Sequence, residues 1–383
     1  MDVVYALQPF PTRVMKTLFL AGPTPRGPGK SWRPEALEKL EAMGFDGHVL
    51  VPEPEDQKWA EDYVDQVEWE AEGLQRADVI VFWVPRDVKT LPGLTTNDEW
   101  GVWKDSGKVV WGNPEGADHV RYQRYYSERL GVPVKDSLAG TLGAALKKLG
   151  EGSLREGEGE CQVPLHVWTR DDFQAWYKSQ KASGNRLDGL TVEWSFWVGK
   201  KRERLFLYSL HANVWISDEE RSKSNECLVL RPDVSVVCLY QRGASHLDTK
   251  VVLVKEFRTP VRNAASMVYE LPGGSSLKQG TDPLQTAADE VSEEVGLTLA
   301  PERLRAHGSR QMGATLCAYH AHLYSVELTP EEMTRLELDD SVHGEPGGEE
   351  RTTIEVLTVG ALLREKLVDW PMMGMVFEVL AKS

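Results

Sequence analysis

Short apolar segments alternate with amphipathic ones through the first 150 residues. Continuous apolar runs lie at 16–21, 48–52, 78–84 and 108–112. Such runs, without strict alternation, are typical of strands buried on both faces of a parallel sheet. Helical patterns lie between and after them, at 33–43, 58–75, 97–105, 118–130 and 137–149. This order predicts an α/β domain over residues 1–149, with a doubly wound parallel sheet and helices on both of its faces.

The hydrophobic period changes to two from about residue 190, which indicates antiparallel strands with one buried face. The alternating segments lie at 191–198, 204–216, 235–241 and 251–257, and a further strand pattern lies at 318–327. Helical patterns lie at 283–295, 358–367 and 371–381, and another begins at Thr329-Pro330-Glu331-Glu332. In that tetrad Thr329 is the predicted N-cap and Glu332 its capping-box partner. We therefore predict an α+β domain over residues 190–383.

The two predicted domains are separated by a segment rich in glycine and glutamate. Residues 150–159 read Gly-Glu-Gly-Ser-Leu-Arg-Glu-Gly-Glu-Gly and contain almost nothing apolar. This composition is typical of an exposed linker. A helical pattern follows at 170–183. We therefore predict that residues 150–189 form a linker and a connecting helix between independently folded domains.

Composition restricts the partners of the chain. The 383 residues are 41% hydrophobic and 27% charged, with a net charge of −15. An acidic chain disfavours nucleic acids and anionic membranes as partners, although a local basic pocket for a small anion stays open. No apolar stretch is long enough to span a membrane, and the N-terminus lacks a secretion signal. Four scattered cysteines without a CxxC pair argue against a thiolate zinc site and fit a cytoplasmic location.

The candidate chemistry of the first half lies where the predicted strands end. Ligands of doubly wound sheets bind at the C-terminal ends of the strands, and Gly22 follows the first of the apolar runs. After the third run, the chain reads Thr95-Thr96-Asn97-Asp98-Glu99 at the start of a predicted helix. A carboxylate in a first helical turn is stabilised by the helix dipole, which by itself explains Glu99. The functional alternative is a carboxylate nucleophile that attacks the anomeric carbon of a sugar.

This half resembles the nucleoside 2-deoxyribosyltransferase-like family over about residues 16–149. The resemblance rests on Leu-Ala-Gly-Pro at 20–23, Ala-Asp-Val-Ile-Val at 77–81 and Glu99-x-Gly101. It implies that Glu99 attacks C1′ of a nucleoside and releases the base. It also implies a pocket, which would be lined by Gly22, Thr95, Thr96, Asn97 and Asp98. Phe19 and Gly93 stand where the family has a tyrosine and an aspartate, so hydrolysis of an N-glycosidic bond, or binding alone, fits as well as transfer.

The second half carries a helix with clustered glutamates. Glu290, Glu293 and Glu294 share one face of the pattern at 283–295, and the glycine pair Gly273-Gly274 precedes it. Carboxylates grouped in this way bind hard cations such as Mg²⁺, while glycines allow close approach of a phosphate. A solvated acidic helix face is the alternative.

This segment closely resembles the signature of Nudix hydrolases, and the resemblance extends over about residues 190–383. It implies that Glu290, Glu293 and Glu294 bind Mg²⁺ or Mn²⁺, with the carbonyl of Gly273 as a further ligand, and Glu294 is also assigned as catalytic. Flanking segments 251–261 and 269–272 are similar to the ADP-ribose pyrophosphatase branch, which assigns substrate contact to Arg258.

Two features of the Nudix resemblance leave alternatives open. Asp289 stands where the family has an arginine. It is either an additional metal ligand or a further negative charge that weakens catalysis. The residue that serves as general base in the family has no counterpart near 308–316. Glu345, Glu349 and Glu350 are candidates for this role. The alternative is that they belong to a solvated acidic loop.

Together these resemblances predict a bifunctional enzyme of nucleotide metabolism. Its partners would be small molecules, a nucleotide or a nucleoside diphosphate linked to another group, such as ADP-ribose. The alternative is a nucleotide sensor in which Phe19, Gly93 and Asp289 mark lost catalysis. A homo-oligomer stays open.

Overall fold

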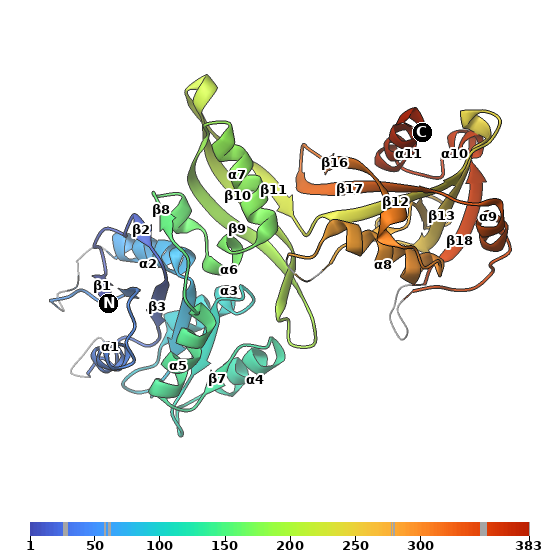
Figure 1. Ribbon diagram of the computed structural model, residues 1–383. Helices are drawn as coiled ribbons and strands as arrows, with labels where there is room; N and C mark the ends of the chain where they lie inside the picture. The colour runs from blue at the N-terminus through green and yellow to red at the C-terminus, as the bar shows by residue number, and fades with distance from the viewer. Residues whose placement is uncertain are drawn as a thin grey trace. The chain divides into compact units, whose positions relative to one another are not determined.

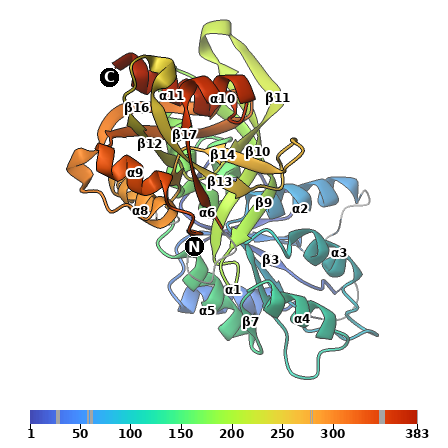
Figure 2. The ribbon, with the colours of Figure 1, turned by 90° about the vertical axis from the view of Figure 1, so that its right-hand side faces the viewer.

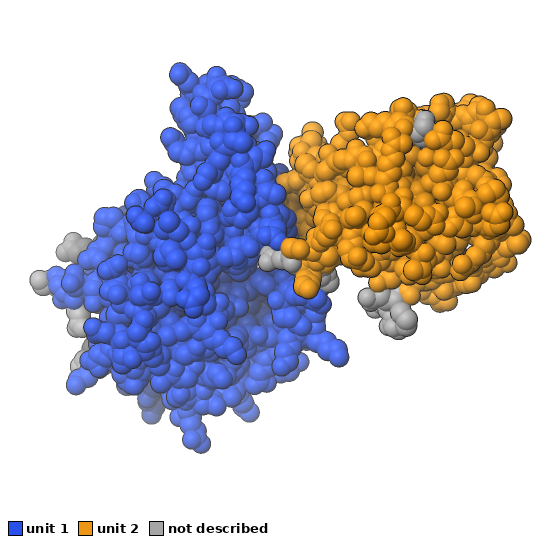
Figure 3. All heavy atoms as spheres, viewed as in Figure 1, with its two compact units in different colours: residues 1–228 blue, residues 229–383 orange. Residues whose placement is uncertain are grey.

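The computed structural model describes residues 1–25, 30–56, 59, 63–276, 278, 280–344 and 351–382. The chain divides into two compact units, residues 1–228 and 229–383 (Figure 3). This division lies well beyond the boundary region predicted at 150–189. The helix and the first long strands that follow residue 149 therefore belong to the first unit.

The centre of the first unit is a six-stranded sheet. Its order is β1 (Asp2–Tyr5), β4 (His48–Val51), β3 (Thr17–Ala21), β5 (Val79–Trp83), β6 (Val109–Gly112) and β7 (Val134–Lys135). Every neighbouring pair is parallel. The four predicted apolar runs form the four central strands, which confirms the α/β sheet. The two edge strands were not predicted, because each is short and only partly buried.

Helices cover both faces of this sheet (Figures 1 and 2). They are α1 (Arg33–Ala42), α2 (Val64–Arg76), α3 (Leu94–Trp103), α4 (Arg121–Arg129) and α5 (Leu138–Leu149). Within β3, Leu18 and Leu20 pack in one core with α1 and α5, while Phe19 and Ala21 pack in a second core with α2 and α3. Alternate residues of a strand point to opposite faces, so a continuous apolar run supplies both cores.

The segment predicted as an exposed linker is anchored to the sheet. Its strand β8 (Arg155–Glu156) pairs with β2 (Arg13–Val14). The Arg155 guanidinium is fully buried and forms a 2.6 Å ion pair with the fully buried Asp78. Asp78 also accepts hydrogen bonds from the backbone N–H groups of Thr17 and Leu165, both at 2.8 Å. The expectation of an exposed tether is therefore corrected, because a single buried arginine replaces the missing apolar anchors.

The remainder of the first unit packs around long antiparallel strands. After η1 (Glu160–Gln162), α6 (Leu165–Trp168) and α7 (Asp171–Ala182), the strand β9 (Arg186–Val198) pairs antiparallel with β10 (Arg204–Ile216). The chain continues through η2 (Ser217–Glu219) into β11 (Arg221–Leu230), which neighbours β10. The period-two pattern thus predicted strands correctly, but β9 and β10 belong to the first unit.

The second unit is built on a mixed sheet. Its strands run in the order β14 (Met267–Glu270), β13 (Lys250–Phe257), β12 (Val234–Gln241) and β17 (Cys317–Glu327). Beside them lie β15 (Gly273–Gly274) on β12, β16 (Arg305–Gly313) on β17 and β18 (Thr353–Thr358) on β13. β12 and β17 are parallel, whereas the β13 pairings are antiparallel.

Helices cover both faces of the mixed sheet as well. α8 (Pro283–Val295) and α9 (Pro330–Glu337) share a core with Val237 and Leu239 of β12. α10 (Val359–Glu365) and α11 (Trp370–Lys382) share a core with Val236 and Cys238 of the same strand. Two short turns, η3 (His246–Asp248) and η4 (Pro301–Arg303), complete the unit. Among the described residues, no helix is long and apolar enough to cross a membrane.

Candidate active site

A cavity of about 320 Å³ opens where the strand order of the parallel sheet reverses. After β3 the chain forms β4 on one side of β3, and it then crosses to form β5 on the other side. Such switch points, at the C-terminal ends of the strands, are where doubly wound folds bind ligands. The walls come from the ends of β3 and β4, from α2 and from the β5–α3 connection. They are Gly22, Thr24, Arg33, Pro52, Trp59, Tyr63, Glu70, Thr90, Pro92, Gly93, Leu94, Thr95, Thr96 and Glu99.

Arg33 fixes the loop that follows β3. Its side chain is 1% exposed and donates hydrogen bonds to the carbonyl oxygens of Leu20 and Gly22, at 3.0 and 2.9 Å. It also forms a 2.6 Å ion pair with Glu53 after β4. Gly22 has a φ of +146°, and a Cβ there would lie 2.2 Å from the carbonyl oxygen of Trp83. The cavity rim therefore needs glycine at this position and a buried arginine to hold it.

Glu99 faces a second carboxyl group in the cavity. Glu70 of α2 and Glu99 of α3 both contribute to the wall. The pKa of Glu99 is raised to about 8, chiefly by burial and also by the charge and hydrogen bond of Glu70, while the charge of Arg33 opposes the shift. At neutral pH Glu99 is therefore mostly protonated, and ionisation of this group is the step that would make it a nucleophile.

The N-terminus of α3 explains one departure from the family pattern. Gly93 is the N-cap residue, with a φ of +59°, and a Cβ there would lie 2.7 Å from Cγ of Pro23. An aspartate at this position would be strained and crowded. Phe19, the other departure, is fully buried in the core and packs 6.3 Å from the Trp69 ring.

The structure brings only part of the predicted pocket together. Gly22, Thr95 and Thr96 lie in the wall with Glu99, but Asn97 and Asp98 do not. Asn97 accepts hydrogen bonds from Arg86 and Gln123, at 2.5 and 2.8 Å, and so ties α3 to its neighbours. Asp98 is exposed. Successive residues of a helix point in different directions, so five consecutive residues could not all face one cavity.

In the second unit, two of the three predicted metal ligands lie against the glycine pair. The Glu294 carboxylate is buried and accepts a 2.8 Å hydrogen bond from the backbone N–H of Gly273. A Cβ on Gly274 would lie 2.3 Å from the Glu290 carboxylate, so this carboxylate packs directly on the backbone. Glu293 is exposed. Within the described part of the chain, no three His, Cys, Asp or Glu side chains are grouped so that they could hold a metal ion.

Arg258 lies among acidic side chains at the end of β13. It forms ion pairs with Glu256 at 2.9 Å and Glu270 at 3.8 Å. Burial raises the pKa of Glu270, and the charge of Arg258 opposes that shift. Asp289 accepts a hydrogen bond from Gln285 on the exposed side of α8. The candidate bases Glu345, Glu349 and Glu350 lie outside the described residues.

The sequence did not assign a role to two residues of the cavity wall, Arg33 and Glu70, or to Glu53, which pairs with Arg33. Arg33 and Glu70 act on the charge of Glu99, and Glu53 pairs with Arg33, yet none of the three stands out within its own segment. Glu70 belongs to an amphipathic helix with several exposed carboxylates, and only the packing of α2 beside α3 distinguishes it from them.

The comparisons with known proteins concern the first unit. No curated protein matches the chain. One family model matches a segment that contains β3 to β6, α1 to α3 and the residues of the Glu99 cavity. Residues 15–117 are similar to the family described as nucleoside 2-deoxyribosyltransferase like.

Proposed function

We propose that the first unit cleaves the N-glycosidic bond of a nucleoside-like small molecule, by transfer or by hydrolysis. The ionised carboxylate of Glu99 attacks the anomeric carbon, the carbon–nitrogen bond breaks, and the leaving base keeps the electron pair and takes up a proton. A second base or water then attacks the same carbon and releases Glu99. The observation that carries the proposal is the position of Glu99, in a cavity at the switch point within the segment that matches the family.

The test measures base release from a panel of 2′-deoxyribonucleosides, with and without a free acceptor base. Mass spectrometry identifies the products. Glu99→Gln keeps the size of the side chain and should lower the rate at least ~100-fold, because loss of a nucleophile costs several kcal/mol of transition-state stabilisation. Asp98→Asn is the matched control, since Asp98 neighbours Glu99 in sequence but is exposed outside the cavity. Equal rates in the wild type and Glu99→Gln would refute the assignment.

We propose a second activity for residues 229–383, the Mg²⁺-dependent hydrolysis of a nucleoside diphosphate linked to another group, such as ADP-ribose. The observation that favours it is the packing of Glu290 and Glu294 on the Gly273–Gly274 backbone. Glu290 and Glu294, with the carbonyl of Gly273 and the phosphate oxygens of the substrate, would hold Mg²⁺ or Mn²⁺, and the ion would polarise the phosphoanhydride. Arg258 would bind the diphosphate.

The second activity is tested by ADP-ribose hydrolysis in Mg²⁺ and by calorimetric titration with Mg²⁺ alone. Glu290→Gln should weaken Mg²⁺ binding and lower hydrolysis together, whereas Glu302→Gln, an exposed glutamate of the same unit, should change neither. If ADP-ribose binds and is not hydrolysed in the wild type, the sensor alternative replaces the enzyme proposal for this unit. A cytoplasmic location remains a prediction from the sequence.

A further inference from the structure

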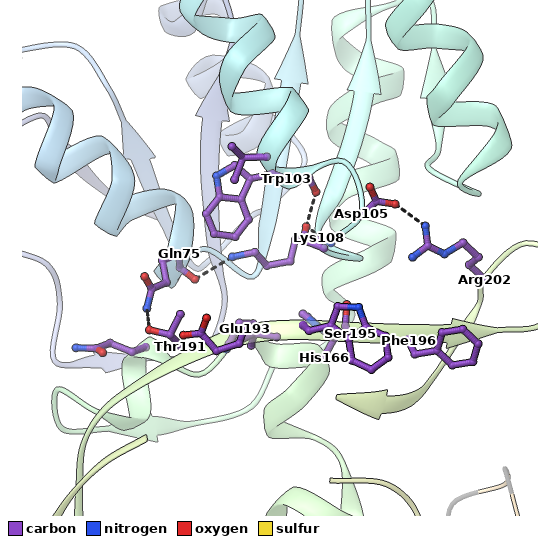
Figure 4. Close-up of a pocket in the computed structure, with 16 residues that line it drawn as sticks. Gln75, Trp103, Asp105, Lys108, His166, Thr191, Glu193, Ser195, Phe196 and Arg202 are labelled. Carbon is purple, nitrogen blue, oxygen red and sulfur yellow. Dashed lines mark hydrogen bonds and ion pairs between the residues drawn. The ribbon is translucent and has the colours of Figure 1, made fainter. Parts of the chain in front are cut away.

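The first unit contains a second and larger cavity, of about 540 Å³ (Figure 4). It lies at the edge of the parallel sheet where β6 begins, opposite the edge that carries the Glu99 cavity. One wall contains the ends of α2 and α3, with Gln75 and Trp103, and the residue before β6, Lys108. The facing wall contains β9, from Thr191 to Phe196, and His166 of α6. All of these elements belong to residues 1–228.

Two nitrogen-bearing side chains in this cavity, His166 and Lys108, are buried, and His166 lacks the hydrogen-bond partners that such a group normally has. Neither ring nitrogen of His166 has a hydrogen-bond partner among the described residues. Lys108 is 2% exposed, and the charge of Asp78 favours its ammonium form. The ammonium donates to the carbonyl oxygens of Leu74 and Gln75, at 2.6 and 2.8 Å, and lies 4.3 Å from the centre of the Trp103 ring.

The unpartnered ring nitrogens of His166 are costly unless something else in the cavity bonds to them. A buried polar group without a hydrogen-bond partner destabilises the folded protein by about 1–3 kcal/mol. Burial lowers the pKa of His166 to about 3 and that of Lys108 to about 7, so His166 is a neutral ring at physiological pH. A neutral imidazole offers one N–H donor and one nitrogen acceptor, and an amine or ammonium group at Lys108 offers further N–H donors.

The cavity also offers flat apolar surface. Trp194 and Phe196 of β9 are stacked with ring centres 6.0 Å apart, and about half of each side chain is exposed. Trp103 forms part of the opposite wall (Figure 4). Aromatic side chains that stay accessible in this way stack favourably on a planar ligand.

We propose that this cavity is a second small-molecule site, which binds a planar heteroaromatic ligand of the oxopurine class. Such a ring stacks on the aromatic side chains, one of its ring nitrogens forms a hydrogen bond with one ring nitrogen of His166, and its carbonyl oxygen accepts a hydrogen bond from Lys108. The proposal does not depend on the reaction proposed for Glu99, because the two cavities lie at opposite edges of the sheet and share no lining residue.

The probe is hypoxanthine, which carries both ring nitrogens and a carbonyl oxygen. Purine lacks the carbonyl, and indole lacks both the carbonyl and a ring acceptor. Calorimetric titration of the full chain should show hypoxanthine binding at least ~5-fold more tightly than purine, with no binding of indole at the same concentrations. Crystals soaked with hypoxanthine should place the ring between Trp103 and β9.

His166→Phe removes both ring nitrogens and keeps a flat ring against Trp197, whose ring centre lies 5.6 Å away. It should weaken hypoxanthine binding at this site at least ~10-fold while the melting temperature is maintained or rises. Trp194→Ala, at the exposed lip, should weaken binding without unfolding the unit. His246→Phe, at an exposed histidine of the second unit, is the matched control and should leave binding unchanged.

Three results would overturn the proposal. These are hypoxanthine density in the Glu99 cavity alone, equal affinity of His166→Phe and the wild type, and no binding of hypoxanthine at millimolar concentration.

Discussion

At the scale of single residues, two carboxyl groups of the first unit show how surroundings decide chemistry. Asp78 is fully buried, but it accepts two backbone hydrogen bonds and pairs with Arg155, so its charge is fully compensated. Glu99 lies at a cavity with another carboxyl group beside it, and the pKa of Glu99 is raised to about 8. The first arrangement stabilises the fold. The second gives Glu99 a pKa close to neutral pH, so that this carboxyl group can gain or lose a proton.

The raised pKa predicts a pH profile for glycosidic cleavage. If ionised Glu99 is the nucleophile, the rate should rise with pH through about 8 and then level off. Glu70→Gln removes a charge and a hydrogen bond that raise the pKa of Glu99, so the rising limb should move to lower pH. The measurement is kcat/KM for base release between pH 5 and 10.

Glu68→Gln is the control for this profile, because Glu68 is an exposed residue of the same helix. It should leave the profile in place. A profile of Glu70→Gln that coincides with the wild type would show that Glu70 does not act on Glu99.

The ion pair of Arg155 and Asp78 predicts a large loss of stability on truncation of one partner. Arg155→Met leaves a buried carboxylate without its cation and should cost about 3–5 kcal/mol in the free energy of unfolding. Urea denaturation measures this cost. The double variant Asp78→Asn with Arg155→Met should recover part of the loss, since no charge then stays buried. A single variant as stable as the wild type would contradict the anchoring role.

At the scale of elements, capping residues define where the helices α8 and α9 begin, and an ion pair connects α9 to a neighbouring segment. α8 begins at the Asp282 N-cap with Pro283 in the first turn and ends at Gly296, whose φ of +65° suits a helix terminus. α9 begins with a complete capping box between Thr329 and Glu332, as the sequence predicted. Arg303 then pairs with Glu332 at 2.7 Å and connects α9 to the η4 turn.

The capping box of α9 predicts a measurable change in stability. Thr329→Ala removes the side chain that accepts from the backbone N–H of Glu332 and should cost about 1 kcal/mol. Thr329→Ser keeps the hydroxyl and should cost much less. Thermal denaturation of the two variants gives the comparison, and an equal loss in both would show that the methyl group, not the cap, stabilises this end of the helix.

At the scale of the whole molecule, the division at residue 228 predicts which fragments fold. A fragment of residues 1–228 retains Arg155, α6, α7 and β9, whereas a fragment of residues 1–149 leaves Asp78 buried without its partner. We expect the fragments 1–228 and 229–383 each to unfold cooperatively on heating. Circular dichroism measures this unfolding. The shorter fragment should be destabilised or unfolded. A stable, cooperative fragment of residues 1–149 would restore the boundary predicted from the sequence.

The sequence by itself determined the elements and the edge of the sheet where one cavity lies. Apolar runs, period-two segments and capping residues act over a few neighbouring positions, so β3 to β6, β12, β13 and α8 follow from local pattern. Gly22 and Glu99 follow from their places after β3 and β5. Only the tertiary structure decided that Arg155 anchors the supposed linker, that Glu70 lies beside Glu99, and that β9 forms a wall of the second cavity. These contacts join segments far apart in the chain, and their energies come from burial and charge pairing that no local pattern contains.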